Sequence, residues 1–518
     1  MADNQTGPVG PRVDVTNALF DQFVDDWKRM RDTFAGETRV KEEGEDYLPR
    51  PSGMGVTGTA TEAQNQMYKA YKDRAQFPDL VAPTVRGMMG VMTGTPPKFD
   101  IPTTMEYLNE RATQDNVTLH GAFERTLQEV LQMGRYGLLV DLDAGGQPQL
   151  VCYTAECIRN WVIETINGKD VLTHLILDES RQEFDKANFS WQEVKRFRVL
   201  ELNDQGQYQT TLWRSDMGGF VIEPRDGLEG DKATQPAVPT MKGGKPLDFI
   251  PFVFIDSTDL TPDPDEIPLI GLARVSLALY RKSADYEQAL YMSGQETLFI
   301  WGISQEDAPS LVGSTVICSF RDSEGHAEYV GPSGAGLSAQ RTAIQDDRAV
   351  AVSIGTKVLN TEGKAQESGD ALRMRFASQT ATLKSINNSV AAGFERALRY
   401  AAMWQSGSAE ADSSIVVTPN NEFVENKLSG MDLTALVTAW QSQAISKQTL
   451  FENLQRGEII RHDKDFDEEQ AEIEEDPVHQ MNAAMQEAAL TGLNNANDPT
   501  ADNPDNPDGG EEGDSAKP

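Results

Sequence analysis

The stretch TEGKAQESGDALRMRF, residues 361–376, joins a loop rich in charge and glycine to an apolar pattern that continues for about ten helical turns. Its apolar residues recur at steps of three, four or seven: Leu372, Phe376, Leu383, Ile386, Val390, Phe394, Ala397 and Ala401. This spacing predicts one helix of roughly 35 residues, about 50 Å long. Ser368 is the predicted N-cap, and Asp370 in the first turn complements the helix dipole. Capping explains how the helix begins but not the sequence of residues 361–366.

Two further long helices are predicted before this loop, with a small β module between them. The first begins at Ile270 and carries an apolar stripe through Leu277 and Tyr280 to Leu290. The second covers residues 337–359. Three short strand-like segments lie between these helices, at residues 296–303, 314–320 and 327–332. The predicted order is therefore helix, β module, helix, charged loop and very long helix.

The first half of the chain changes from helical to strand-like periods near residue 134. Helical spacing is predicted for residues 15–34, 62–76, 80–92 and around 119–130, with a polar link at 35–54. Alternation then predicts strands at 138–142 and 149–153, hairpins about 167–168 and 204–206, an exposed loop at 227–247 and a buried strand at 249–255. The fold class predicted is α+β, mainly α.

The C-terminal part is predicted to hold smaller elements. Beyond Trp404 a linker leads to a strand-like segment, residues 415–423, and then to two or three short helices. An acidic run ends at Asp476, and a further helical stretch is predicted near residues 479–493. The tail from about residue 494 has little apolar material to bury and is expected to be disordered.

The charge balance limits the classes of function. The 518 residues include 81 acids and 46 bases, a formal net charge of -35, of which -13 falls in residues 461–476 and 498–517. A protein that grips nucleic acid by neutralising phosphates needs clustered Lys and Arg, so this class is disfavoured. A protein that surrounds DNA without gripping it is compatible with the charge. The alternative is that the acid excess simply keeps a large protein soluble.

The motifs of common enzyme and metal sites are missing from the sequence. None of the three Gly-Lys pairs has the G-x4-G-K-[ST] spacing that cradles a phosphate, and GPSGAG lacks the ordered strand and helix of a dinucleotide site. The five histidines are isolated, and Cys152 and Cys157 have no second pair to complete a zinc site. Asp263, Asp265 and Glu266 fit a solvated turn better than a cation site. We therefore expect no enzyme, no cofactor and no metal.

The sequence also predicts the compartment in which the chain is made. Three cysteines without a disulfide pattern favour reduced thiols, as in the cytosol. The N-terminus has no apolar signal region, and no apolar run approaches the ~18 residues that span a bilayer. We expect a soluble protein without a membrane partner.

The order of elements from residue 264 to 400 resembles that of tailed-bacteriophage portal proteins: stem, clip, second stem helix, tunnel loop and long wing helix. YLPRPSGM, YKAYKDRAQF and EVLQMGRYGLLVDL resemble the N-terminal wing of a portal subfamily, and YTAECIRNW resembles its β region. NTEGKAQESGDALRMR resembles the stretch around the tunnel loop, and AISKQTLFENLQRGEI followed by an acidic run resembles the crown. Each motif is moderately specific, and their order along the chain is more so.

The resemblance implies a division of the chain. It assigns residues 1–262 to the wing, 263–295 to the first stem helix, 296–336 to the clip, 337–359 to the second stem helix, 360–368 to the tunnel loop, 369–430 to the long wing helix and a return strand, 431–493 to a helical crown-like region and 494–518 to an acidic tail. The resemblance also implies a head-tail connector fold with long stem and wing helices, a β-rich wing and a small β clip.

Site residues are likewise implied by the resemblance. The tunnel loop that lines the DNA channel would contribute Glu362, Lys364, Gln366 and Glu367. The stem would contribute Arg274, Arg281, Lys282, Arg341 and Arg348, and the clip would dock its partners through Phe299, Trp301, Phe320, Arg321 and Tyr329. An ordinary solvated loop lysine is the alternative for Lys364.

The function implied is that of a portal, a DNA conduit without catalytic activity. A homo-oligomeric ring, expected to be a dodecamer, would sit at one capsid vertex, and double-stranded DNA would be packaged and ejected through it. The implied partners are the terminase large subunit, later a head-tail adaptor, and the major capsid protein, with a scaffold protein as a further candidate. The protein would be made in the host cytoplasm and end in the virion. The alternative is an acidic DNA mimic or assembly scaffold without a channel.

Overall fold

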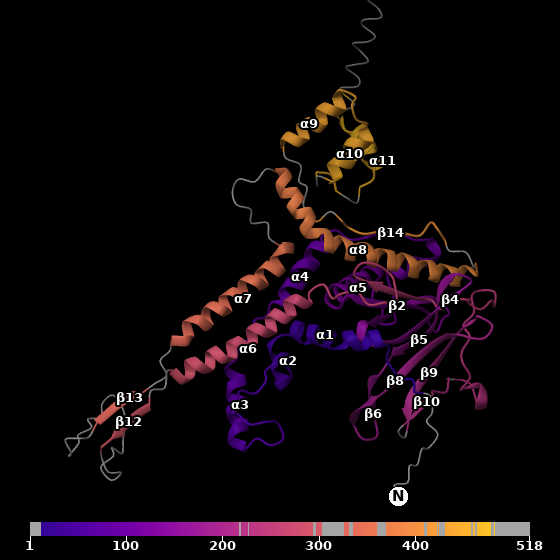
Figure 1. Ribbon diagram of the computed structural model, residues 1–518. Helices are drawn as coiled ribbons and strands as arrows, with labels where there is room; N and C mark the ends of the chain where they lie inside the picture. Colours follow the sequence, from indigo (N-terminus) through magenta and orange to yellow (C-terminus); the bar gives the residue numbers. More distant parts are fainter. Residues whose placement is uncertain are drawn as a thin grey trace, which may run out of the picture. The chain divides into compact units, whose positions relative to one another are not determined.

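The computed structural model describes residues 12–216, 219–225, 227–293, 297–302, 326–330, 335–359, 369–408, 412–421, 423, 430–456, 459–461, 464–477 and 481. The chain divides into two compact units, Met1–Phe423 and Val424–Pro518, which are described separately. Figure 1 shows the helices and strands. Both classes of element are abundant, so the predicted mixture of α and β structure is confirmed.

Five helices open the first unit, four of them where helical spacing predicts them. They are α1 (Ala18–Ala35), α2 (Glu37–Glu42), α3 (Glu62–Arg74), α4 (Val81–Met92) and α5 (Leu119–Met133). Their ends follow local sequence signals. Asn17 caps α1 through its side chain, Thr61 and Gln64 form a capping box at α3, and α5 ends at Gly134 in the left-handed conformation (φ 74°).

The strands of the first unit form two larger sheets and smaller ladders. The strands before α6 are β1 (Lys98–Asp100), β2 (Arg135–Leu142), β3 (Pro148–Thr154), β4 (Ile158–Ile166), β5 (Lys169–Asp178), β6 (Arg181–Asp185), β7 (Ser190–Val194), β8 (Arg196–Leu202), β9 (Tyr208–Asp216), β10 (Gly219–Ile222) and β11 (Phe252–Asp256). One sheet has the order β10-β9-β8-β5-β4 and the other the order β11-β2-β3. The predicted hairpin turns are confirmed at Asn167-Gly168 (φ 53° and 76°) and at Gly206 (φ 70°).

The second half of the first unit holds the long helices. It contains α6 (Ile270–Ser293), β12 (Thr297–Trp301), β13 (His326–Val330), α7 (Ala335–Leu359), α8 (Gly369–Ser406) and β14 (Val416–Thr418), which pairs with β1. α8 has 38 residues, which correspond to about 57 Å along the helix axis, and Figure 1 shows that the helix bends near its start. The long helix predicted from residue 368 is thus confirmed. Ser368 itself lies outside the described residues.

The core of the first unit lies where α8 crosses the three-stranded sheet. α8 packs against β11, β2 and β3, and α5 packs against both α8 and β2. All five residues of β11 are buried, as predicted for this segment. The helix and the sheet approach closely at Gly393, because a Cβ built there would lie 2.5 Å from both Cδ1 and Cγ1 of Ile255. Only glycine fits this crossing without movement of the sheet.

Replacing Gly393 with alanine is therefore expected to destabilise the protein despite the better helix propensity of alanine. Propensity favours alanine by about 1 kcal/mol, whereas overpacking a core costs about 1–3 kcal/mol. We expect a net loss of up to about 2 kcal/mol in the free energy of unfolding, measured by urea denaturation. Gly90→Ala on α4 is the matched control, because a Cβ there would meet nothing within 4 Å. A Gly393→Ala variant as stable as Gly90→Ala would contradict the close crossing.

The predicted polar link at residues 35–54 is more ordered than expected. It folds into α2 and a 3₁₀ turn at Gly44–Asp46, and it buries Val40, Tyr47, Leu48 and Met54. These side chains form a second apolar cluster with α3 and with Leu277, Tyr280 and Ala284 of α6. The prediction that residues 35–54 form a solvated connector is wrong, because these residues hold the middle of α6 against α3.

The second unit is helical over its described residues. It contains α9 (Gly430–Gln441), α10 (Lys447–Arg456) and α11 (Phe466–Glu475), and α9 packs against α10. α11 occupies the acidic run, where no helix was predicted. Asp465 caps it, and Asp467, Glu468 and Glu469 lie in its first turn, where negative charge is favourable. The helical stretch predicted near 479–493 and the tail lie outside the described residues, apart from Met481.

Candidate assembly surface

The helices α6 and α7 run side by side, as Figure 1 shows. An ion pair joins them, with Lys282 Nζ of α6 lying 2.6 Å from Asp347 Oδ2 of α7. One face of the N-terminal half of α6 is buried, whereas Leu290, Tyr291 and Met292 near its end are 37%, 46% and 48% exposed. The pair therefore begins in the core and ends with apolar side chains in solvent.

Polar contacts from α3 fix the emerging half of α6. The Tyr71 hydroxyl donates to Asp285 Oδ1 at 2.7 Å, and burial together with this carboxylate raises the pKa of Tyr71. Ser283 Oγ donates to the Gln76 carbonyl at 2.7 Å and accepts from the Gln76 amide at 3.0 Å. The Arg74 guanidinium lies 4.3 Å from the centre of the Tyr291 aromatic ring. α6 is thus held on one side by α3 and on another by α7.

The side chains of α7 that the structure describes bury only one narrow face of the helix. Ala351 is its one buried side chain among those described, and Leu337, Ala343, Ile344 and Asp347 are partly buried. The remaining described side chains of α7 are exposed, including Val350 at 50%. A helix with so little burial is poorly stabilised on its own, because packing of an apolar face supplies most helical stability. The exposed surface of α7 is the main candidate for contact with another molecule.

The predicted clip residues are divided between described and undescribed parts of the chain. β12 and β13 form an antiparallel ladder in which Trp301 faces His326, with their aromatic ring centres 4.6 Å apart. Phe299 and Trp301 are 52% and 49% exposed. Phe320 and Arg321 lie outside the described residues, as does the strand-like segment at 314–320. The backbone of Tyr329 lies in β13 opposite Leu298, and its side chain is outside the description.

The tunnel-loop residues, which are Glu362, Lys364, Gln366 and Glu367, also lie outside the described residues. Their assignment stays a prediction. The structure describes the two helices on either side of them. α7 ends at Leu359 and α8 begins at Gly369, so the loop connects these two helices.

The five predicted stem cations do not lie in one environment. Arg274 pairs with Asp26 of α1 at 2.8 Å, and Arg281 Nε donates to the Tyr47 carbonyl at 2.8 Å. Both line a hollow of about 280 Å³ with Arg29 and Leu277. Lys282 pairs with α7, whereas Arg341 and Arg348 are exposed on α7, and no ion pair of either is found among the described residues. The sequence prediction therefore placed in one group, the stem cations, side chains that have different surroundings in the structure.

A buried charged pair lies where the chain enters α6. Arg135 begins β2 and Asp256 ends β11, their side chains are 1% and 0% exposed, and Arg135 Nε lies 3.9 Å from Asp256 Oδ1. Burial lowers the pKa of Arg135 and raises that of Asp256, because each charge is removed from water. Arg135 Nη2 donates to the Pro262 carbonyl at 2.7 Å, and its guanidinium lies 4.4 Å from the centre of the Trp161 aromatic ring. The pair fixes the segment that leads into α6.

α8 holds the same segment from its other side. The Ser389 hydroxyl donates to the carbonyls of Asp256 and Asp259, at 2.7 and 2.9 Å. Within the segment, Asp265 Oδ2 accepts hydrogen bonds from the Thr258 amide and hydroxyl, at 2.7 and 2.6 Å. Residues 257–269 are therefore tied to both the sheet and α8. This segment is therefore a joint between the start of α6 and the long helix α8.

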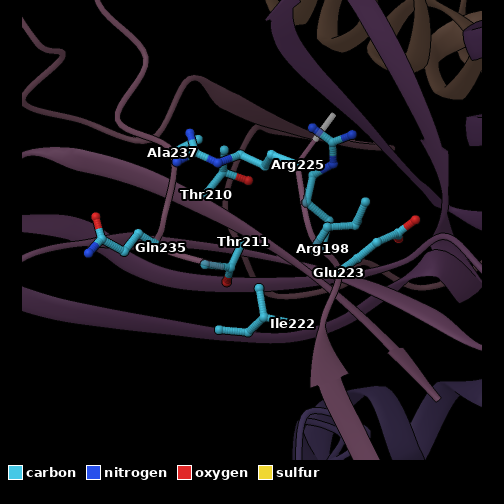
Figure 2. A pocket seen from close by; sticks show the side chains of 9 residues that line it. Arg198, Thr210, Thr211, Ile222, Glu223, Arg225, Gln235 and Ala237 are labelled. Atoms are coloured by element: carbon cyan, nitrogen blue, oxygen red, sulfur yellow. The ribbon is translucent and has the colours of Figure 1, made fainter. Parts of the chain in front are cut away.

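A second hollow, of about 110 Å³, lies on the five-stranded sheet, and Figure 2 shows the side chains around it. Its charged groups already have protein partners. Arg198 contacts Asp141 at 2.8 Å and Glu179 at 2.7 Å, and Glu223 contacts Arg196 at 2.6 Å. We assign no ligand to this hollow.

Two properties of the described residues bear on other classes of function. No group of three or more His, Cys, Asp or Glu side chains in the described part of the chain is arranged to hold a metal ion. Within the same residues no helix is long and apolar enough to cross a membrane. Burial raises the pKa of Cys152 to about 11, which keeps this thiol protonated near neutral pH.

Comparison with known proteins gives one family match and distant structural likenesses. A family model described as a domain of unknown function, DUF4055, matches residues 268–405, which span α6 to α8. No curated protein matches. The neck of an empty GTA particle, computed with C6 symmetry, has a TM-score of 0.37 at 11% identity, covering 78% of this chain and 95% of that chain. The neck of a native GTA particle, computed with C12 symmetry, has a TM-score of 0.33 at 10% identity, covering 71% and 86%.

Proposed function

We propose that this chain is the subunit of a portal-type ring at a capsid vertex, a conduit for double-stranded DNA without catalytic activity. The observation that carries the proposal is the order of the described elements from α6 to α8. A long helix, a two-stranded β ladder, a second long helix and a helix of 38 residues follow one another. This is the order of stem, clip, stem and long wing helix in the family that the sequence resembles.

The exposed surface of α7 supports assembly. A ring closes when each subunit uses two different surfaces to contact its two neighbours. α7 leaves most of its described side chains in solvent, and Leu290, Tyr291 and Met292 of α6 add exposed apolar area. Apolar side chains gathered in this way usually mark an interaction site. Packing of the α6–α7 pairs side by side around an axis would bury this surface.

The charge of the chain supports a conduit that does not hold its cargo. About a dozen subunits, each with a net charge of -35, surround a polyanion with like charge, so repulsion from every side centres the duplex. Screening at physiological salt acts over about 8 Å, which confines the effect to the narrowest part of the channel. A few basic residues in that part can contact phosphates briefly, and Lys364 is the best candidate. In this role the terminase large subunit and later a head-tail adaptor would dock at the clip.

The decisive experiment measures the oligomeric state and the shape of the purified chain. Mass photometry over a range of concentrations, followed by electron microscopy, is expected to show closed rings of about a dozen subunits with an opening that admits a duplex. The measurement is repeated with the scaffold protein of the same particle, because rings can need a scaffold to close. A monomer or dimer under both conditions, or a ring whose opening is too narrow for a duplex, would overturn the proposal. A monomer that competes with DNA for basic proteins would favour the DNA-mimic alternative.

Replacing Lys364 with glutamate is expected to impair DNA packaging or retention while rings still form. The substitution puts one more negative charge per subunit where the duplex passes, and it removes a phosphate contact. Packaged DNA per particle is measured by nuclease protection, and the fall is expected to be severalfold. Lys186→Glu, an exposed lysine between β6 and β7, is the control for the same change of charge. Unchanged packaging and retention would remove the role proposed for Lys364.

A further inference from the structure

Three consecutive charged residues of α7, Asp346, Asp347 and Arg348, have different surroundings. Asp347 is partly buried and pairs with Lys282 of α6 at 2.6 Å. Asp346 and Arg348 are both exposed, and neither has an ion-pair partner among the described residues. The middle residue of the three thus holds α7 in place within the subunit, and the two flanking charges remain available to another molecule.

Helix geometry places the two flanking charges on opposite faces of α7. Each residue turns the helix by about 100°, so Asp346 and Arg348 lie on either side of the direction fixed by Asp347 and are about 200° apart. The burial pattern agrees with this orientation, because the buried Ala351 and the partly buried Ile344 lie within about one turn of Asp347 and on the same side of the helix. One face of α7 therefore carries a negative charge and the opposite face a positive charge.

The two charges also lie at nearly the same height along α7. Two residues correspond to a rise of about 3 Å along the helix. The Asp and Arg side chains are long enough to bridge this difference in height between neighbouring helices. Rotation about a ring axis parallel to the helix keeps the height of every atom. Asp346 of one copy and Arg348 of the next would then face each other at almost equal height. Arg341 shares the face of Arg348 but lies about 7.5 Å from the height of Asp346, so it is less well placed.

We propose that Asp346 of one subunit pairs with Arg348 of a second copy of this chain, and that this contact sets the register of neighbouring stems. The inference rests on the proposed ring and names the partner of its exposed α7 surface. Opposite charges on opposite faces are what a head-to-tail interface requires, since each copy offers both halves of the contact. The pairing also offsets local repulsion between copies that each carry a net charge of -35.

A second copy explains this arrangement better than DNA does. A DNA-binding surface would need basic side chains on the face that meets the phosphates. Arg348 is positively charged and could contact a phosphate, whereas Asp346 is negatively charged and would repel it. Two cations of the neighbouring helix α6 are already engaged, because Lys282 pairs with Asp347 and Arg281 donates to the Tyr47 carbonyl. Among the described residues of α7, Asp346 is the acid without an ion pair, and Arg348 lies closer to it in height than Arg341 does.

Charge reversal on the full-length chain tests the contact. Asp346→Arg and Arg348→Asp, made singly, each place like charges across every interface of the ring. Each is expected to raise the protein concentration at half-assembly by about tenfold or more, because the change repeats at all interfaces. The double variant Asp346→Arg/Arg348→Asp restores opposite charges at every interface and is expected to return to within about threefold of the wild type. Mass photometry measures each value, and circular dichroism confirms that the variants fold.

A matched control isolates the effect of position from that of charge. Asp204→Arg, in the exposed turn between β8 and β9, changes the net charge by the same amount as Asp346→Arg and is expected to leave assembly unchanged. Single variants that assemble like the wild type, or a folded double variant that does not recover, would overturn the pairing while the wild-type ring still stands. An Arg348→Asp variant that forms normal rings but loses DNA retention would overturn it in favour of a DNA contact. A wild type that forms no ring would remove the proposed function and the pairing together.

Discussion

Replacing Arg135 with methionine is expected to lower the free energy of unfolding at neutral pH by about 3–5 kcal/mol, the cost of removing one partner of a buried ion pair. The substitution leaves the Asp256 carboxyl buried without a positive charge and the Pro262 carbonyl without its hydrogen bond. It also removes the guanidinium from beside the Trp161 aromatic ring. Methionine fills a similar volume, so charge and hydrogen bonding, not a cavity, account for the loss. Urea denaturation followed by tryptophan fluorescence measures it.

The loss is expected to shrink as the pH is lowered. Burial already raises the pKa of Asp256, and removal of the Arg135 charge raises it further. The folded state then holds this proton more tightly than the unfolded state does, so stability falls as the pH rises from about 4, the unfolded value, toward the folded value. Adding Asp256→Asn to the methionine variant removes the ionisable group, and the double variant should recover most of the stability and lose the pH slope. A deficit that is the same at pH 5 and pH 8 would contradict this account.

The elements that the sequence predicts correctly are those with strong local patterns. The apolar stripe of α8 recurs over 38 residues, and the hairpin turns at Gly168 and Gly206 carry residues that tolerate positive φ. β11 is a short, continuously apolar segment between turn signals. In each of these cases the information lies within one element, so neighbouring residues are sufficient to define it.

The features that the sequence did not predict depend on residues far apart in the chain. Arg135 and Asp256 are brought together by the pairing of β2 with β11, and Lys282 meets Asp347 across the intervening β module. Tyr47 is another example, because it is buried in one cluster with Leu277 and Tyr280 of α6, which lie far from it in the sequence. None of these contacts has a local period. The periodicity of apolar residues therefore predicts the helices but not the joint that connects them.

The candidate assembly surface was also predicted only in part, and for the same reason. Sequence correctly placed basic residues on the helices now seen as α6 and α7, but it could not separate Arg274, which pairs with α1, from Arg348, which is exposed. It also passed over Asp346 and Asp347. A usable signal was present, since adjacent acids followed by a base on one helix must point to different faces. Which face is buried follows only from the packing of α7 on α6.

Replacing Phe394 with alanine is expected to cost about 3–5 kcal/mol of the free energy of unfolding, because the residue is fully buried where α8 crosses the core. Its aromatic ring centre lies 5.3 Å from that of Phe123 on α5 and 6.4 Å from that of Phe99 on β1. The cavity would remove contacts to both elements at once, and neither can follow, since α5 and β1 are held by other partners. Phe189→Ala is the matched control, because that side chain is 81% exposed and its loss should change stability by less than about 0.5 kcal/mol. Equal urea midpoints for the two variants would show that α8 is not anchored at this crossing.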